Sequence, residues 1–242
     1  MHLDYAIILA FLAAALPLMG KLRVEKILRR PEISQAERLR LYASTIAFQW
    51  LLVAVILWRT AVHTLSIAAL GLALPRPVLT VAVSIGLVAL VLANQLVSLR
   101  FVGSRPEELH GKLAQVALRI FPQDHIERLA FVGVVSTVAI CEELIYRGFV
   151  QTLFADILHS GFAGIVISAA MFSFAHLYQG RRGLIATFIV GLLFSVSRFY
   201  TASLIPSVAG HFVVDLIAGY MFPRRLREAL ASESRIEARD VQ

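Results

Sequence analysis

The sequence predicts an all-α fold, a polytopic membrane helix bundle of about seven transmembrane helices plus one interfacial amphipathic helix. Of the 242 residues, 58% are hydrophobic and 16% are charged, whereas a soluble domain carries about 25% charge. The mean hydropathy is +0.76, and apolar runs recur at the roughly 17 to 25 residues that cross a bilayer as a helix. We therefore expect one integral membrane domain over residues 1–242, in contact with the lipid bilayer.

Seven apolar runs supply the predicted spans. They cover about Leu3–Met19, Ala43–Leu57, Val78–Leu99, Arg128–Leu158, Phe162–Leu177, Leu184–Val196 and Leu204–Phe222. Residues 63–74 are apolar but too few to cross, and Pro75-Arg76-Pro77 follows them, so we expect an interfacial or re-entrant piece there. The last span is expected to end at Pro223, before a charged tail.

Between the third and fourth spans, apolar residues recur at helical spacing, at Leu109, Leu113, Val116, Ala117 and Ile120. This pattern predicts an amphipathic helix on the membrane surface. The third span also carries an amide pair, Asn94 and Gln95, which we interpret as interhelical hydrogen bonders.

The basic residues predict the orientation of the chain. The net charge is +7, but its Lys and Arg side chains fall between apolar spans, which does not favour a nucleic-acid partner. Seven spans place the basic loops after spans one, three and five, and the basic tail, on one side. Because positive loops stay in the cytoplasm, we expect the N-terminus outside and the C-terminus in the cytoplasm, in a bacterial-type inner (plasma) membrane.

The central span carries charges that a membrane helix normally avoids. Glu142, Glu143 and Arg147 lie within an apolar run, where each unpaired charge costs at least about 2.5 to 3.5 kcal/mol. Glu143 and Arg147 are four residues apart and share a helix face, so they can pair. Glu142 has no opposite charge at that spacing and needs a partner on another helix. A surface ion cluster is the alternative interpretation, and the neighbouring Cys141, the only cysteine, reads as an apolar filler.

Two histidines fall inside later spans. His176 closes the pattern Phe172-Ser173-Phe174-Ala175-His176, and His211 shares a helix face with Asp215, four residues on. An imidazole that only hydrogen bonds to a backbone carbonyl is the alternative for either residue. Together with the three charges of the central span, they predict a functional site inside the bundle.

These motifs resemble those of a known family, the CAAX prenyl endopeptidase and bacteriocin-processing (CPBP, or Abi) intramembrane proteases. The matching patterns are Glu-Glu-x-x-x-Arg from Glu142, Phe-x-x-x-His ending at His176, and His-x-x-x-Asn/Asp ending at Asp215. By this resemblance, residues 127–222 would form the catalytic helices. Residues 1–126 would be divergent N-terminal spans and loops, and residues 223–242 a cytoplasmic tail.

The resemblance implies hydrolysis of a peptide bond in a membrane-associated or prenylated protein or peptide. Glu142 would activate the water, and Glu143 with Arg147 would orient Glu142. His176 would position the water, and His211 would face the oxyanion. Zinc remains open, because His176 and His211 with a carboxylate could form a three-ligand site. Asp215, where other members have Asn, leans slightly towards a metal, since a carboxylate cannot donate to an oxyanion.

Two other classes of protein also keep buried charges. A small transporter would tend to show inverted repeats, and a non-enzymatic immunity or scaffold protein would share the fold without the reaction. Replacing Glu142 with Gln distinguishes these alternatives from a protease. The length of Arg128–Leu158 as one helix also exceeds the hydrocarbon core, so we expect its first two or three turns to project into the cytoplasm, covered by the segment around Leu113–Ile120.

Overall fold

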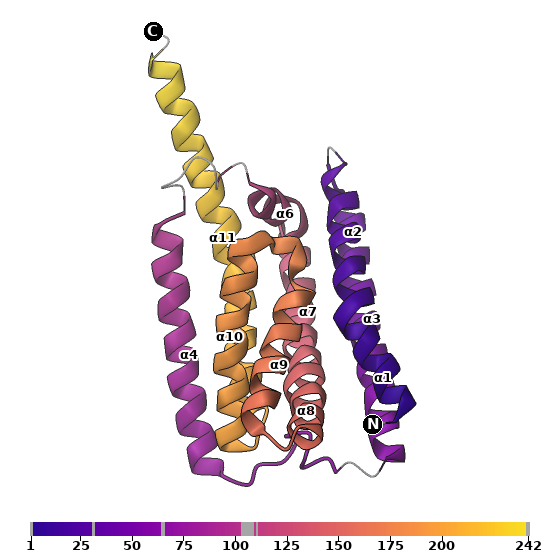
Figure 1. Cartoon of the computed structure of the whole chain (residues 1–242). Helices are drawn as coiled ribbons and strands as arrows, with labels where there is room; N and C mark the ends of the chain where they lie inside the picture. The colour runs from indigo at the N-terminus through magenta and orange to yellow at the C-terminus, as the bar shows by residue number, and fades with distance from the viewer. Residues whose placement is uncertain (1, 31, 64–65, 103–108, 110, 241–242) are drawn as a thin grey trace.

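The computed structural model describes residues 2–30, 32–63, 66–102, 109 and 111–240, with the backbone alone for residues 236–240. Its helices run side by side in one bundle (Figure 1). Over these residues, six helices are long and apolar enough to cross a membrane, and one shorter apolar helix accompanies them. The predicted all-α membrane bundle is confirmed.

The first span is one continuous helix, Leu3–Leu28. It comprises α1 (Leu3–Ala10), a π-helical turn (Phe11–Ala15) and α2 (Leu16–Leu28). The expected end of this span at Met19 is therefore wrong. Lys21, Arg23 and Lys26 continue the helix because long basic side chains are good helix formers.

The second span, α3 (Gln35–Val62), also extends beyond its predicted ends. Its start is fixed by a capping box. The Ser34 side chain accepts the backbone N–H of Glu37, and the Glu37 side chain reaches back to the backbone of Ser34. Polar residues of the expected loop thus form the first two turns of the helix.

The third span, α4 (Pro77–Arg100), agrees with its prediction to within one residue at either end. Before it, residues 66–76 form turns without a helix. This segment closes one end of the bundle, because the Ala69 carbonyl accepts the Thr152 hydroxyl and the Gly71 carbonyl accepts the backbone N–H of Leu204. The side chain of Leu70 is buried there.

The amphipathic helix is α6 (Lys112–Ile120), which lies beyond the connection of α9 and α10 at one end of the bundle (Figure 1). Its buried side includes Ala114, Val116 and Ala117. Leu113 was predicted on that side but is 47% exposed. On a helix of nine residues the buried stripe is narrow. The small side chain of Ala114, rather than that of Leu113, faces the bundle and allows the helix to approach it closely.

The central helix is the longest apolar one that the sequence predicts, a continuous run from His125 to Ile157 of 33 residues. It comprises α7 (His125–Glu143), a π-helical turn (Leu144–Val150) and α8 (Gln151–Ile157). Asp124 caps its start by accepting the backbone N–H of Glu127. Ile120 and Phe121 pack with Phe131 and its neighbours, so the end of α6 covers the first turns of α7.

The next helix, α9 (Gly161–Ala175), has only 15 residues and is shorter than its predicted span. A single 3₁₀ turn, Leu177–Gln179, leads from it to α10 (Gly180–Thr201). The predicted basic turn at residues 180–183 is therefore wrong, because these residues form the first turn of α10. The predicted sixth span is correspondingly too short at both ends.

The last helix, α11 (Ile205–Asp240), continues through Pro223, where the sequence predicted its end. A proline ring crowds the carbonyl four residues earlier, which here belongs to Gly219. Proline is tolerated within membrane helices when neighbouring groups compensate. The predicted charged tail is thus an extension of α11 that projects from the bundle (Figure 1).

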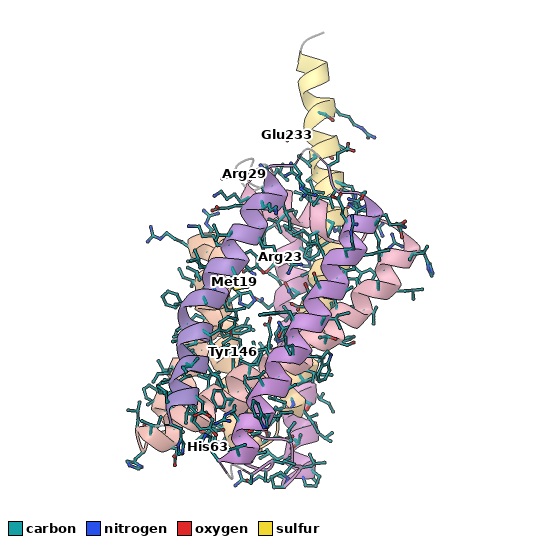
Figure 2. The ribbon with its side chains drawn as sticks, turned by 90° about the vertical axis from the view of Figure 1, so that its right-hand side faces the viewer. Met19, Arg23, Arg29, His63, Tyr146 and Glu233 are labelled. Atoms are coloured by element: carbon teal, nitrogen blue, oxygen red, sulfur yellow. The ribbon has the colours of Figure 1, made fainter. Side chains whose placement is uncertain are left out.

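The largest buried cluster surrounds the π-helical turn of the central helix. It combines Tyr146 and Phe149 of that turn with Leu12 of the first span and with Val53 and Ile56 of α3. Figure 2, which faces the N-terminal helices, shows Tyr146 behind them near the middle height of the bundle. The cluster fills the bundle on the side of the N-terminus, just past Glu142 along the chain.

Candidate active site

Glu142 lies at the end of α7 and meets partners on two other helices. Gln49 of α3 donates its amide Nε2 to Glu142 Oε1 at 2.9 Å. His211 of α11 places its Nε2 4.0 Å from Glu142 Oε2. That oxygen is buried, yet it has no hydrogen-bond partner among the described residues. The side chain as a whole is 16% exposed, so solvent reaches its edge.

Glu143 is fully buried and receives two donors on one oxygen. Its Oε1 accepts Arg147 Nη1 at 2.8 Å and His211 Nδ1 at 2.9 Å. The structure therefore contains the pair of Glu143 and Arg147 that the sequence predicts. Glu143 contacts His211 instead of orienting Glu142, because a rotation of about 100° per residue turns it towards α11.

Arg147 is also fully buried, and its charge is compensated in three ways. Besides Glu143, its Nη2 donates to the backbone carbonyl of Gly191 at 3.2 Å. Its guanidinium lies over the ring of Phe172 at 4.2 Å and that of Phe194 at 5.3 Å. Such cation–π contacts are strongest when the cation is desolvated. Arg147 thereby joins the central helix to α9 and α10.

His211 is held in a defined orientation between three carboxylates. Since Glu143 can only accept in its paired, ionised form, His211 donates through Nδ1 and presents Nε2 to the remaining groups. Nε2 lies 3.5 Å from Asp215 Oδ2 and 4.0 Å from Glu142 Oε2. Asp215 is 34% exposed and His211 only 5%, so access to solvent increases one turn along α11 towards its C-terminus.

His176 follows the last residue of α9 and contacts the same ring as His211. Its Nδ1 donates to the Phe172 carbonyl at 2.8 Å, because a carbonyl can only accept. The centre of the Phe172 ring lies 4.7 Å from that of His176 and 5.7 Å from that of His211. The hydrogen bond from the imidazole to a backbone carbonyl, the alternative considered from the sequence, is present. It uses only Nδ1 of His176 and leaves Nε2 for water or substrate.

The three-ligand zinc site considered from the sequence stays a prediction. Within the part of the chain that the structure describes, no three His, Cys, Asp or Glu side chains are placed to hold a metal ion. His176 and His211 each use Nδ1 in a hydrogen bond and keep Nε2 for another partner. Cys141 is buried in the apolar cluster around the π-helical turn.

Sequence reasoning did not identify Gln49, which contacts Glu142 directly. The signal was present, because Gln49 is the only amide in the predicted span Ala43–Leu57, and a lone amide in a membrane helix tends to bond across helices. It also did not identify the ion pair of Arg38 and Glu127, at 2.8 Å, which joins α3 to the start of α7. Asp124 and Glu127 form a pattern typical of a helix start, and this pattern could have indicated that Glu127 has a structural role.

An apolar cavity of about 570 Å³ lies between α4, the central helix and α11, and none of the six predicted site residues lines it. Part of its wall comes from the central helix, through Ala139 and Ile140 of α7 and Leu144 of the π-helical turn, and part from α11, through Val208 and Phe212. These residues flank Glu142 and His211 along their helices. The remaining wall includes Val88 of α4, the turns before α4, and Ser203 and Leu204 between α10 and α11.

Comparison with known proteins places the family resemblance over the same helices. Residues 125–217 match the family model described as type II CAAX prenyl endopeptidase Rce1-like. The match confirms the resemblance to the CAAX prenyl endopeptidase and CPBP proteases. No curated protein and no solved structure matches the chain. The matched segment includes all six predicted site residues, whereas Gln49 and the rest of α3 lie outside it.

Proposed function

We propose that this integral membrane protein is an intramembrane endopeptidase that hydrolyses a peptide bond of a membrane-associated or prenylated protein or peptide. The observation that carries the proposal is the buried Oε2 of Glu142, which has no hydrogen-bond partner within the described part of the chain and lies 4.0 Å from His211 Nε2. It lies in a segment that matches a family of type II CAAX prenyl endopeptidases. A buried carboxylate oxygen next to an imidazole, on a side chain that is itself partly exposed, can hold and deprotonate a water molecule.

In the proposed reaction, Glu142 takes one proton from water, and the resulting hydroxide adds to the scissile carbonyl carbon. The oxyanion that forms is stabilised by hydrogen bonds from nearby donors. His211 donates Nδ1–H to Glu143, so its Nε2, which faces Glu142, donates to the oxyanion only when the ring is doubly protonated. His176 donates Nδ1–H to the Phe172 carbonyl, and with its ring doubly protonated its Nε2–H donates to the oxygen of the water, which leaves both water hydrogens for other acceptors. The C–N bond then breaks, and the proton held by Glu142 passes to the leaving amine.

Glu143 and Arg147 act as positioning residues in this mechanism. Their ion pair is buried completely, and the same Glu143 oxygen holds His211 Nδ1. This bond fixes which ring nitrogen of His211 carries hydrogen towards Glu143, and so which one faces the reacting groups. Asp215 contacts Nε2 from the more exposed side.

We further propose that water enters the site from the side of α6 and of the C-terminus, and that this side is the cytoplasmic one. The apolar cluster around Tyr146 and Phe149 fills the opposite side, and exposure increases from His211 to Asp215. The predicted orientation, with the N-terminus outside a bacterial-type inner membrane, rests on the basic residues at this end.

The test uses a farnesylated peptide that ends in a CAAX sequence and its unprenylated counterpart, with the full chain in detergent or vesicles. Glu142→Gln keeps the shape of the side chain and removes the base, so we expect hydrolysis to fall about 10²–10⁴-fold. Ser136→Ala on the same helix is the matched control, because this hydroxyl bonds only to the carbonyl of Val132 in its own helix. Wild-type rates in Glu142→Gln would exclude the proposed mechanism, and a comparison of the two peptides measures whether the lipid is required.

A further inference from the structure

We propose that Gln49 is a positioning residue of the same reaction: its Nε2 holds the Glu142 carboxylate, and its Oε1 accepts a hydrogen of the attacking water. The inference rests on the proposed function. It assigns a role to α3, which lies outside the segment that matches the endopeptidase family. The N-terminal half would then complete the active site in addition to spanning the membrane.

The first step of the argument concerns two buried oxygens. Gln49 Oε1 and Glu142 Oε2 are both buried and have no hydrogen-bond partner among the described residues. Buried polar atoms are normally paired, and exceptions need an explanation. Both oxygens belong to the same hydrogen-bonded pair of side chains, which meets through Gln49 Nε2 and Glu142 Oε1 at 2.9 Å.

The second step is the kind of group that these oxygens need. Both are acceptors, so only a donor can satisfy them, and the amide orientation follows from the bond to Glu142, since Nε2 is the donor. A water molecule carries two hydrogens and can satisfy two acceptors at once. One hydrogen would lie on Glu142 Oε2, which takes it, and the other on Gln49 Oε1, which keeps it hydrogen bonded.

The third step is the chemistry. When Glu142 removes one proton, the new hydroxide bonds to the carbonyl carbon, and its remaining hydrogen stays on Gln49 Oε1. Gln49 is neither protonated nor deprotonated at any step. Its contribution is orientation, because fixing both hydrogens of the water directs the free electron pairs at the substrate, and small errors in such geometry reduce rates strongly.

The fourth step is that α3 holds Gln49 rigidly against α7. Val53 and Ile56, on the same face of α3, are buried in the apolar cluster around Cys141 and Tyr146. The neighbouring Trp50 donates its indole Nε1 to Thr137 of α7 at 3.3 Å. Together with the ion pair of Arg38 and Glu127, three polar contacts join these helices, and among them only the one made by Gln49 involves the proposed base.

The experiment compares three variants of the full chain with wild type, using the farnesylated peptide. Gln49→Met keeps the approximate shape and removes both polar atoms. Gln49→His keeps an N–H donor at similar reach. Trp50→Phe is the matched control, because it removes a neighbouring polar contact between α3 and α7 that does not involve Glu142. Thermal unfolding in detergent is measured for each, so that activity is compared only among folded proteins.

A hydrogen bond to a charged group that is lost should lower kcat of Gln49→Met about 10- to 100-fold, with KM changed less than about twofold. We expect Gln49→His to recover part of this loss and Trp50→Phe to keep the wild-type kcat. A wild-type kcat in Gln49→Met, together with an inactive Glu142→Gln, would overturn this inference and leave the proposed function intact. A change in KM alone would also overturn it. So would an equal fall in kcat in Gln49→Met and Trp50→Phe. If Gln49→Met does not fold, the decision rests on Gln49→His. The inference then requires that kcat of Gln49→His is lower than kcat of Trp50→Phe.

Discussion

Arg147 is the residue on which the inner part of the site depends, because it is the largest fully buried side chain of the described chain and it is charged. Removing one partner of a buried ion pair costs about 3–5 kcal/mol, since the other charge is left without compensation. We expect Arg147→Ala to lower the thermal stability in detergent strongly and to abolish hydrolysis. Arg147→Lys keeps the charge but loses the planar stacking between Phe172 and Phe194. Its stability and its activity should therefore lie between those of wild type and those of Arg147→Ala.

Arg181→Ala serves as the control for these two variants. Arg181 lies in the first turn of α10 and is exposed, so its removal should change stability by no more than about 0.5 kcal/mol. If Arg147→Ala unfolds at the same temperature as Arg181→Ala, the buried pair does not stabilise the bundle as argued.

A second prediction at the residue scale concerns zinc. Because the described donors do not form a three-ligand site, we expect the purified protein to hold substoichiometric zinc, equal in wild type and in His176→Ala. Hydrolysis should also continue in the presence of a chelator. Element analysis of the detergent-purified proteins measures this directly. One zinc per chain in wild type that is lost in His176→Ala would show that the side chains rearrange to bind metal.

Some of these contacts could be predicted from the sequence and others could not. The pair of Glu143 and Arg147 follows from a spacing of four residues, which fixes a shared helix face. The bond between Glu143 and His211 depends on how α11 is rotated against α7, and no spacing within one helix determines that. The same holds for Gln49 and Glu142, which are 93 residues apart. The convergence of charged motifs was therefore predictable, but the partners of each atom were not.

At the scale of the helices, close packing between α8 and α9 depends on Gly164. A methyl group added there would lie 2.5 Å from the carbonyl oxygen of Gln151 and 3.0 Å from Cβ of Ala155. Such overpacking typically costs about 1–3 kcal/mol. We therefore expect Gly164→Ala to lower the unfolding temperature, and to lower activity too, because α9 leads directly to His176.

Gly86→Ala is the matched control for this prediction. Nothing lies within 4 Å of a methyl group added at Gly86 of α4, and alanine favours a helix over glycine. Its stability should equal or exceed that of wild type. Equal unfolding temperatures for Gly164→Ala and Gly86→Ala would mean that α8 and α9 can separate without cost.

The start of α7 gives a prediction of pH dependence. The backbone N–H of Glu127 bonds to the carboxylate of Asp124 and holds the pKa of Asp124 below its usual range. A lowered pKa stabilises the folded state above the usual value of about 3.9, and this stabilisation is lost as the pH falls through the lowered value. The unfolding temperature of wild type should therefore exceed that of Asp124→Ala above about pH 4, with a difference that shrinks in more acidic buffer.

Asp124→Asn separates the cap from its charge. Asparagine caps helices as well as aspartate does but does not titrate. The difference between Asp124→Asn and Asp124→Ala should thus stay constant over the same pH range. A constant difference for wild type as well would show that the carboxylate of Asp124 is not the titrating group.

The ends of the helices were the least predictable part of the fold. Charged residues suggested loops at Lys21 and at residues 180–183, and Pro223 suggested a helix end, yet helices continue through all three. A charged residue or a proline reports only on its own few neighbours in the sequence. The length of these helices also depends on packing outside the apolar core. The order of the apolar helices, which depends on long hydrophobic runs, was predicted correctly, but of the seven predicted spans six are long enough to cross a membrane among the described residues, and α9 is shorter.

At the scale of the whole molecule, the depth of Glu142 in the membrane determines whether water can reach it. The run from His125 to Ile157 has 33 residues and is about 50 Å long as a helix, whereas the hydrocarbon core is about 30 Å thick. One end must therefore project. The first turns of α7 are covered by the end of α6 and anchored by the buried pair of Arg38 and Glu127, so we expect this end to lie in the cytoplasm.

Cysteine labelling in a Cys141→Ser background tests this arrangement with a matched pair of positions on α7. Leu129 is 65% exposed and Ile140 is 40% exposed, and they are separated by about 16 Å along the helix. If the first turns project, Leu129→Cys should react with a membrane-impermeant thiol reagent from the cytoplasmic side. Ile140→Cys, two residues before Glu142, should not react with it and should instead be quenched by probes dissolved in the lipid. If both positions behave like Ile140→Cys, the first turns of α7 lie in the hydrocarbon core, and Glu142 is then too deep for the proposed entry of water from the cytoplasm.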